Sequence, residues 1–262
     1  MKIGVSTASF FPREECENAI DKIKKCGAEC AEIFLGTYYE YRPEYARAHR
    51  ERFSDIPISA VHALSGNFEP QLFSPSRRVR GDAFYWLDQL MRSAQLLGTD
   101  KYTFHGYISR CSGGENIDEV SGLLNAVCEF CAHYQVTVCL ENVSWCTYNR
   151  PGLFKKFKER CPQLAAVLDL KQARRSGYPI NMYIEDMAGA ISHVHLSDVD
   201  KDGHICLPGR GIYDFAEIFK RLHGVGFDGD AVIEVYGDNY GDYEEIARSV
   251  EFLKETEYKI GR

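Results

Sequence analysis

The sequence lacks the features that assign many proteins to membranes or to nucleic acids. None of its apolar runs approaches the ~20 residues that a membrane-spanning helix needs, so we expect no membrane association. It also has no excess of positive charge, because 31 Lys and Arg stand against 38 Asp and Glu, for a net charge of -7. Non-specific affinity for nucleic acids comes mainly from Lys and Arg, so this balance argues against a nucleic-acid partner.

Motifs that would mark a nucleotide site, a serine nucleophile or a disulfide scaffold are also missing. No Walker loop, G-x-S-x-G or G-x-G-x-x-G follows a strand-like segment, which leaves nucleotide binding and serine hydrolysis without support. The chain has ten cysteines, but the C-x-x-C pair Cys128 and Cys131 has no second pair to complete a zinc site. We expect buried, reduced thiols in a cytoplasmic protein, because the start of the chain shows no hydrophobic segment of a signal peptide.

What the sequence does contain is a regular alternation of short apolar runs with longer amphipathic segments. Helical spacing of apolar residues, as at Cys16, Ala19, Ile20 and Ile23, separates the runs. Eight such units in 262 residues average about 33 residues, the size of one β-α step, and no linker interrupts them. We therefore predict one (β/α)8 TIM barrel domain over residues 1–262, with a doubly wound open sheet as the alternative. The predicted strands are 3–5, 31–35, 58–62, 101–105, 136–141, 164–169, 191–196 and 231–235.

Six predicted strands end on a residue that can bind a metal ion or carry a proton. A barrel brings all these ends to one face, where active sites of this fold lie. A single His at a strand end is more often structural, but unpaired acids there are unfavourable unless a cation or hydrogen bonds hold them. The alternative to a metal is a set of salt bridges with Arg or Lys. The six residues are His62, His105, Glu141, Asp169, His195 and Glu234.

The mixture of oxygen and nitrogen ligands favours one divalent ion (Mn, Mg, Co or Zn) without a preference for soft metals. We expect four of the six residues to converge on that ion, namely Glu141, Asp169, His195 and Glu234. If open positions remain on the ion, it can also act as a Lewis acid on substrate oxygens.

Five segments at or after these strand ends occur in a characteristic order. They are Leu140-Glu141-Asn142, Leu168-Asp169, His193-Val194-His195-Leu196-Ser197-Asp198, Pro208-Gly209-Arg210-Gly211 and Ile233-Glu234. Together they resemble the xylose-isomerase-like TIM barrel superfamily over nearly the whole chain. That group includes sugar phosphate isomerases and epimerases, ketose 3-epimerases, hydroxypyruvate isomerases, inosose dehydratases and apurinic endonucleases. The order of the motifs is fairly specific to the superfamily and is not specific to one activity.

The resemblance implies a metal-dependent isomerase or epimerase that acts on a sugar or sugar phosphate. Glu141, Asp169, His195 and Glu234 would bind the metal, and Glu141 and Glu234 would form the acid–base pair. Polarisation of a ketose carbonyl would favour an enediolate, with one Glu removing the carbon-bound proton and the other returning one. Return to the opposite face gives epimerisation, and return to the neighbouring carbon gives isomerisation; the sequence does not separate the two.

The resemblance also assigns residues around the metal site. It implies that His62 and His105 contact substrate, or additional metals as in the endonucleases, and that Asp198 orients the metal-site loop. Gln172 stands where many members have a substrate-contacting His, and its amide can bind a hydroxyl but cannot carry a proton. Gln172 and the acidic net charge both argue against an apurinic endonuclease or phosphodiesterase, which is therefore kept as the alternative function and not the main one.

Loop residues supply further candidates for substrate contact. Trp145 could stack on a sugar face or cover the barrel rim, and Arg210 could reach an anionic group or cap a loop. Segment 64–79 is long for a β-α connection, which is typical of binding loops. A silent ligand-binding barrel is a further alternative, although such a barrel would be expected to have lost one of the acids. A homo-oligomer is compatible with the exposed barrel helices.

Overall fold

Eight parallel strands close into a barrel in this computed structural model, which describes residues 1–108 and 117–261. The strand order is β1-β10-β7-β6-β5-β4-β3-β2. Closure is made by β1 and β10, which pair from Lys2 with Asp230 through Val5 with Ile233. The prediction of a (β/α)8 barrel is confirmed, and the open sheet is excluded by this pairing. The barrel strands are β1 (Lys2–Ser6), β2 (Ala31–Leu35), β3 (Ile58–Ala63), β4 (Lys101–Phe104), β5 (Thr137–Glu141), β6 (Ala165–Asp169), β7 (Ile191–Leu196) and β10 (Asp230–Ile233).

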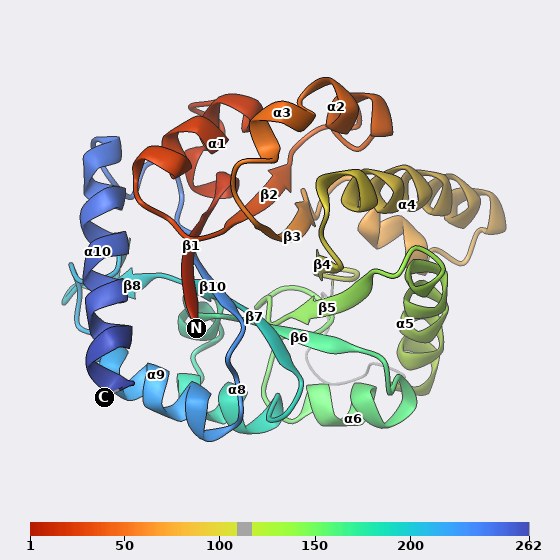
Figure 1. Cartoon of the computed structure of the whole chain (residues 1–262). Helices are drawn as coiled ribbons and strands as arrows, with labels where there is room; N and C mark the ends of the chain where they lie inside the picture. The colour runs from red at the N-terminus through yellow and green to blue at the C-terminus, as the bar shows by residue number, and fades with distance from the viewer. Residues whose placement is uncertain (109–116, 262) are drawn as a thin grey trace.

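Helices surround the strands on the outside of the barrel (Figure 1). Their apolar faces pack on the sheet, as residues Leu87, Leu90, Met91 and Ala94 do, and Gly98 ends that helix in the left-handed conformation. The helices are α1 (Cys16–Lys25), α2 (Pro43–Ala48), α3 (Arg50–Phe53), α4 (Arg77–Leu97), α5 (Ile117–Ala132), α6 (Leu153–Arg160), α7 (Leu170–Ser176), α8 (Ile180–Asp186), α9 (Phe215–Gly224) and α10 (Tyr243–Ile260), with short 3-10 helices η1 (Thr7–Phe10) and η2 (Glu69–Phe73). None of the described helices is long and apolar enough to cross a membrane.

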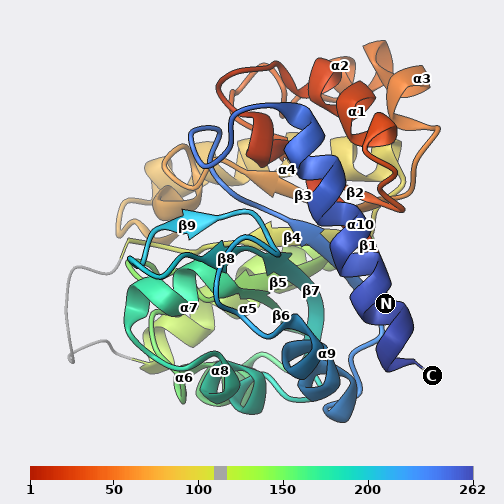
Figure 2. The same cartoon turned by 90° about the vertical axis from the view of Figure 1, so that its left-hand side faces the viewer.

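A small antiparallel hairpin lies apart from the barrel, between β7 and α9. Its strands, β8 (Asp198–Val199) and β9 (Ile205–Cys206), pair with each other and form a separate two-stranded sheet. Figure 2 shows the hairpin on one side of the barrel and both chain termini on the opposite side. The hairpin therefore borders the face where the strands end and where the predicted site residues stand.

The cysteines serve as small apolar groups in the core. All nine that the structure describes are free thiols, and eight of them are buried, including Cys128 and Cys131. Cys206 is half-buried on the hairpin, and Cys111 lies outside the described residues. The expectation of buried, reduced thiols is confirmed for those eight.

Candidate active site

Four ligand candidates converge at the carboxyl ends of four strands. Glu141 and Asp169 are the last residues of β5 and β6, His195 is in β7, and Glu234 directly follows β10. One ligand atom from each lies within 4.8 Å of the others. All four residues are buried, with exposures between 0% and 9%. The convergence that the sequence predicted is thus present in the fold.

A local hydrogen-bond clamp positions the first two acids. The Asn142 side chain donates from Nδ2 to the Asp169 carbonyl at 2.9 Å and accepts the Asp169 N–H at 2.6 Å. The side chain of Asp169 also caps α7, since its Oδ1 accepts the Gln172 N–H at 2.7 Å. The clamp joins the end of β5 to the end of β6, and the cap leaves Oδ2 of Asp169 to face the site.

The donor set fits a divalent metal ion. Three carboxylates and one imidazole are the ligands that Mn, Mg, Co or Zn sites use. Two of the ligand atoms, Glu141 Oε2 and His195 Nδ1, are buried and make no hydrogen bond of good geometry among the described residues. Each has only ion-pair contacts there, among them Glu141 Oε2 with His105 Nε2 at 3.2 Å and His195 Nδ1 with Glu234 and Asp169. Buried polar atoms of this kind are unfavourable unless a partner satisfies them. A cation held by all four side chains would satisfy both.

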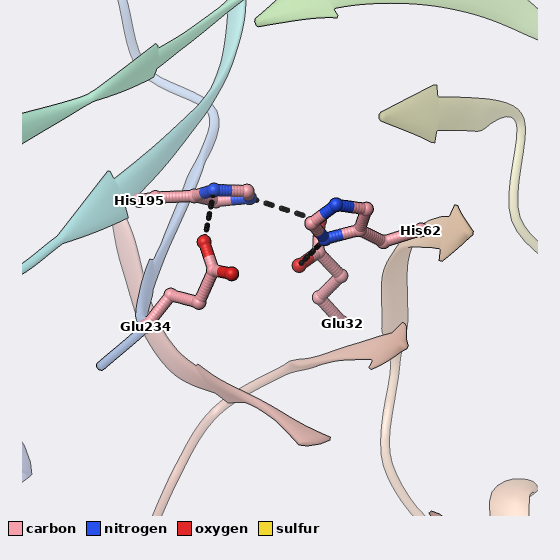
Figure 3. Close-up of side chains that lie close together, drawn as sticks. All are labelled: Glu32, His62, His195 and Glu234. Carbon is pink, nitrogen blue, oxygen red and sulfur yellow. Dashed lines mark hydrogen bonds and ion pairs between the residues drawn. The ribbon is translucent and has the colours of Figure 1, made fainter. Parts of the chain in front are cut away.

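Glu32 forms the floor of the site, and the sequence prediction missed it. This residue of β2 is 0% exposed and accepts hydrogen bonds from Ser6 Oγ at 2.9 Å and Thr103 Oγ1 at 2.7 Å. Its carboxylate also lies 3.3 Å from His62 Nδ1 and 3.0 Å from His195 Nε2. Figure 3 shows His195 held between Glu32 and Glu234. Although burial raises the pKa of Glu32, the adjacent imidazoles of His195 and His62 hold it well below its usual range.

A second buried acid, Glu69, holds the other histidine and was also missed. Glu69 Oε2 lies 3.1 Å from His105 Nδ1 and also accepts the His105 backbone N–H. The Nε2 atoms of His105 and His62 lie 2.9 Å apart, and His105 Nε2 is 3.2 Å from Glu141 Oε2. Burial lowers the pKa of His105, but Glu69 and Glu141 outweigh this effect and raise it to about 10. Burial in turn raises the pKa of Glu141, yet His105 lowers it to about 2.

Lys171 brings an unpredicted positive charge to the same acids. Its Nζ pairs with Asp169 and lies 3.5 Å from Glu234 Oε2. Burial alone would lower the pKa of Lys171, but Asp169, Glu234 and Glu141 raise it well above its ordinary value. Among the described residues, the salt-bridge alternative considered from the sequence is thus represented by Lys171, whose ion pairs are with Asp169 and Glu234 and not with Glu141 or His195.

A cavity of about 870 Å³ opens directly above this cluster. His62, His105, Trp145 and Gln172 line it, as do the acids Glu141 and Glu234. Trp145 is 40% exposed, and Gln172 is held by the Ser144 hydroxyl, which donates to its Oε1 at 3.1 Å. Of the long segment 64–79, Leu64 and Ser65 reach the cavity wall. The placement of these residues is compatible with substrate contact, and their roles stay predictions.

Asp198 and Arg210 lie in the hairpin region rather than on the cavity wall. The Asp198 carboxylate accepts backbone N–H groups from four residues: Val199, Gly209, Gly211 and Tyr213. A Cβ on Gly211 would overlap this carboxylate and the Val199 carbonyl, which explains the second glycine of the P-G-R-G motif.

The structure places Arg210 away from the cavity wall, and its contact with substrate stays a prediction. Its guanidinium pairs with Glu245 in the first turn of α10, and Arg210 does not line the cavity. The second reading of the sequence, in which Arg210 fixes a loop, describes its observed position.

A family model agrees with the geometry. The model for the xylose isomerase-like TIM barrel matches residues 20–256. The chain belongs to this family. An uncharacterized protein of Methanocaldococcus jannaschii is 27% identical over 275 residues, which cover 97% of this chain and 89% of that protein. An uncharacterized protein of Mycobacterium tuberculosis is 25% identical over 288 residues, which cover 97% of both chains.

Solved structures of three other proteins show a similar fold. A D-tagatose 3-epimerase-like protein matches with a TM-score of 0.80 and 22% identity, over 100% of this chain and 98% of the other. D-psicose 3-epimerase from Clostridium cellulolyticum H10 matches with a TM-score of 0.80 and 18% identity, over 98% and 99%. A 3-keto-D-glucoside 4-epimerase from E. coli matches with a TM-score of 0.76 and 18% identity, over 97% and 99%.

Proposed function

We propose that this protein is a divalent-metal-dependent isomerase or epimerase that acts on a sugar or a sugar derivative. The observation that carries the proposal is the convergence of Glu141, Asp169, His195 and Glu234 at the floor of a cavity large enough for a sugar. Membership of a barrel family that includes sugar epimerase structures supports the substrate class, since these neighbours share the fold. Fold alone does not establish an activity, so the site has to be tested.

The chain's own residues supply the proton transfers in this proposal. A divalent ion bound by the four side chains would act as a Lewis acid that polarises substrate oxygens. Glu141 and Glu234 both line the cavity and have depressed pKa values, so each is a carboxylate at neutral pH. One would remove the proton from the carbon beside a carbonyl, and the other would return a proton after taking one from solvent or substrate. His62 and His105, which line the same cavity beside Glu141, would bind substrate hydroxyl groups.

Metal content and solvent exchange test the proposal together. Protein dialysed against Mn2+ should hold about one ion per chain, and Glu234→Gln should lose it because an amide is a weak ligand. Wild-type protein in D2O should introduce deuterium beside the carbonyl of a ketose, and Glu141→Gln should slow this exchange at least ~100-fold. Glu217→Gln is a matched control, because Glu217 is on α9 and pairs with Arg221 at the surface. A wild-type protein that binds no ion after reconstitution would refute the proposal.

A metal-dependent phosphodiesterase is the second candidate, because the structure contains a further possible ligand group. His62, His105 and Glu141 also place ligand atoms within 4.8 Å of one another and share Glu141 with the first group. Adjacent metal sites that share a carboxylate are typical of two-metal phosphoryl chemistry. Two or three ions per chain, with hydrolysis of a phosphodiester and no deuterium exchange, would favour this candidate. The hairpin group Asp200, Asp202 and His204 is largely exposed and carries no argument of its own.

A further inference from the structure

The side chain of Lys171 connects the candidate metal ligands to the cavity wall. Lys171 is 2% exposed, and its Nζ pairs with Asp169 Oδ2 and lies 3.5 Å from Glu234 Oε2. The same two oxygens lie beside His195 Nδ1 and belong to the four-residue ligand set. A divalent ion held by this ligand set would therefore compete with the ammonium group for the same carboxylate oxygens.

The cavity offers the Lys171 ammonium a second position. Lys171 lines the cavity, and its Nζ lies 5.6 Å from the ring centroid of Tyr236, which stands on the same wall. Repulsion between an ammonium and a divalent cation a few Å apart is strong in a buried site. The flexible four-carbon side chain of lysine allows the head group to turn away from the acids. A Lys171 side chain displaced from Asp169 and Glu234 would face the cavity.

A second cation stands one helical turn further along α7. Arg175 follows Lys171 by four positions, so the two side chains share a helix face. The Arg175 guanidinium lies 5.0 Å from the Tyr236 ring centroid and donates to the Tyr236 hydroxyl at 2.7 Å. Among residues 1–108 and 117–261, no carboxylate forms an ion pair with Arg175. Arg13, also on this wall, is instead held by three backbone carbonyl oxygens.

We propose that Lys171 and Arg175 form an anion subsite that becomes complete when a divalent ion binds Asp169 and Glu234. The inference rests on the metal-dependent function proposed above and specifies its substrate, a sugar derivative that carries a carboxylate or a phosphate. Without the ion, Lys171 neutralises the two buried acids. With the ion, its ammonium turns into the cavity and binds the anionic group together with Arg175.

Metal affinity provides the first test. Calorimetric titration of metal-stripped protein with Mn2+ should show roughly tenfold or greater tightening in Lys171→Met, because a competing cation is removed. Arg175→Met should leave Mn2+ affinity unchanged. Arg174→Met is the matched control, because Arg174 lies against Gly203 beside the hairpin and does not line the cavity. Equal Mn2+ affinity in wild type and Lys171→Met would overturn the proposal.

Anion affinity provides the second test, with three-carbon probes that differ only in one end group. Glycerol phosphate or glycerate should bind Mn2+-loaded wild type at least about tenfold more tightly than glycerol. Both Lys171→Met and Arg175→Met should lose this preference, and Arg174→Met should keep it. The tighter of the two anions identifies whether the subsite accepts phosphate or carboxylate. Anions that bind no better than glycerol would overturn the proposal.

A measurement on the unaltered chain is also needed, because Lys171→Met leaves two buried acids unpaired. Amine acetylation followed by mass spectrometry should find Lys171 protected in metal-stripped protein and reactive after Mn2+ is added. Lys158, whose Nζ donates to the Leu164 carbonyl at 2.6 Å, should react equally in both states. Unchanged protection of Lys171 in the Mn2+ complex would overturn the proposal. Failure of wild type to bind Mn2+ would instead refute the metal-dependent function itself.

Discussion

At the scale of single residues, Glu32 determines how the ring of His195 is presented. The Glu32 carboxylate lies 3.0 Å from His195 Nε2, which leaves Nδ1 to face Asp169 and Glu234. Carboxylates that hold the second nitrogen of a metal-binding imidazole typically change metal affinity about 10–100-fold when mutated. We predict that Glu32→Gln weakens Mn2+ binding about 10–100-fold, because an amide cannot hold both histidine nitrogens as acceptor. Calorimetric titration of metal-stripped protein measures this change.

Glu29, an exposed acid just before β2, is the control for the Glu32→Gln prediction. Glu29 accepts the Ile3 N–H at 3.0 Å, at the opposite end of the barrel from the ligand cluster. Glu29→Gln should therefore leave Mn2+ affinity unchanged. A folded Glu32→Gln protein with wild-type Mn2+ affinity would show that Glu32 packs in the barrel interior without orienting His195 for metal binding.

The residues found from the sequence and those missed differ in where they stand on their strands. Glu141 and Asp169 directly follow apolar runs, so the strand pattern itself marks them as residues of the barrel mouth. Glu32 stands inside the run Ala-Glu-Ile-Phe-Leu, where alternation places it opposite Ile33 and therefore inside the barrel. Lys171 follows the strand in a helical turn, and no spacing rule indicates that its side chain turns back toward Asp169.

At the scale of elements, Asp198 anchors the chain that returns from the hairpin to α9. Its carboxylate accepts four backbone N–H groups between Val199 and Tyr213. Removal of the acceptor leaves several partly buried donors unsatisfied, at about 1–3 kcal/mol for each buried group. We predict that Asp198→Ala lowers the free energy of unfolding by about 3 kcal/mol, measured by urea denaturation with metal-stripped protein.

Asp200 on the same hairpin is the matched control for Asp198. It accepts two backbone N–H groups, from Asp202 and His204, but in an exposed turn where water replaces the lost acceptor. Asp200→Ala should cost less than about 1 kcal/mol. Similar losses in the two variants would contradict the view that the buried position of Asp198 matters.

The elements themselves were largely predictable, and the exceptions have physical reasons. All eight barrel strands were found because each is a short apolar run between helical patterns. Between β2 and β3 the chain forms two short helices rather than the one helix of a regular β-α unit, since His49 leaves helical geometry between α2 and α3. Strands β8 and β9 have two residues each, which is too short for a periodic signal.

At the scale of the whole molecule, closure of the barrel creates the electrostatics of the site. Glu32 and His195 are 163 positions apart in the chain and 3.0 Å apart in space. The alternation of elements predicts that strand ends meet at one face, but the partner of each acid depends on strand tilt and side-chain direction. The sequence therefore indicates which acids and histidines gather. Only the folded barrel shows that Glu69 and Glu141 flank His105.

This arrangement predicts how the stability of metal-stripped protein depends on pH above neutrality. The pKa of His105 is raised from 6.5 to about 10, because Glu69 and Glu141 outweigh the effect of burial. A group whose pKa is higher in the folded state stabilises fully below its unfolded pKa, and the stabilisation is lost as the pH rises through the folded pKa. The free energy of unfolding should fall between pH 6.5 and about 10, by at most ~1.4 kcal/mol per pH unit for this one group.

Glu141 determines how the free energy of unfolding changes at acid pH, because its pKa is lowered from 4.5 to about 2. Its contribution is present above pH 4.5 and is lost as the pH falls toward 2, so the pair with His105 stabilises most between 4.5 and 6.5. Urea denaturation at a series of pH values measures the loss of stability at both acid and alkaline pH. His105→Asn should reduce the loss of stability at alkaline pH, whereas His133→Asn should not, because His133 is exposed beside α5. If His105→Asn lost stability at alkaline pH as steeply as wild type, the charge on this imidazole would not be what stabilises the buried carboxylates of Glu69 and Glu141.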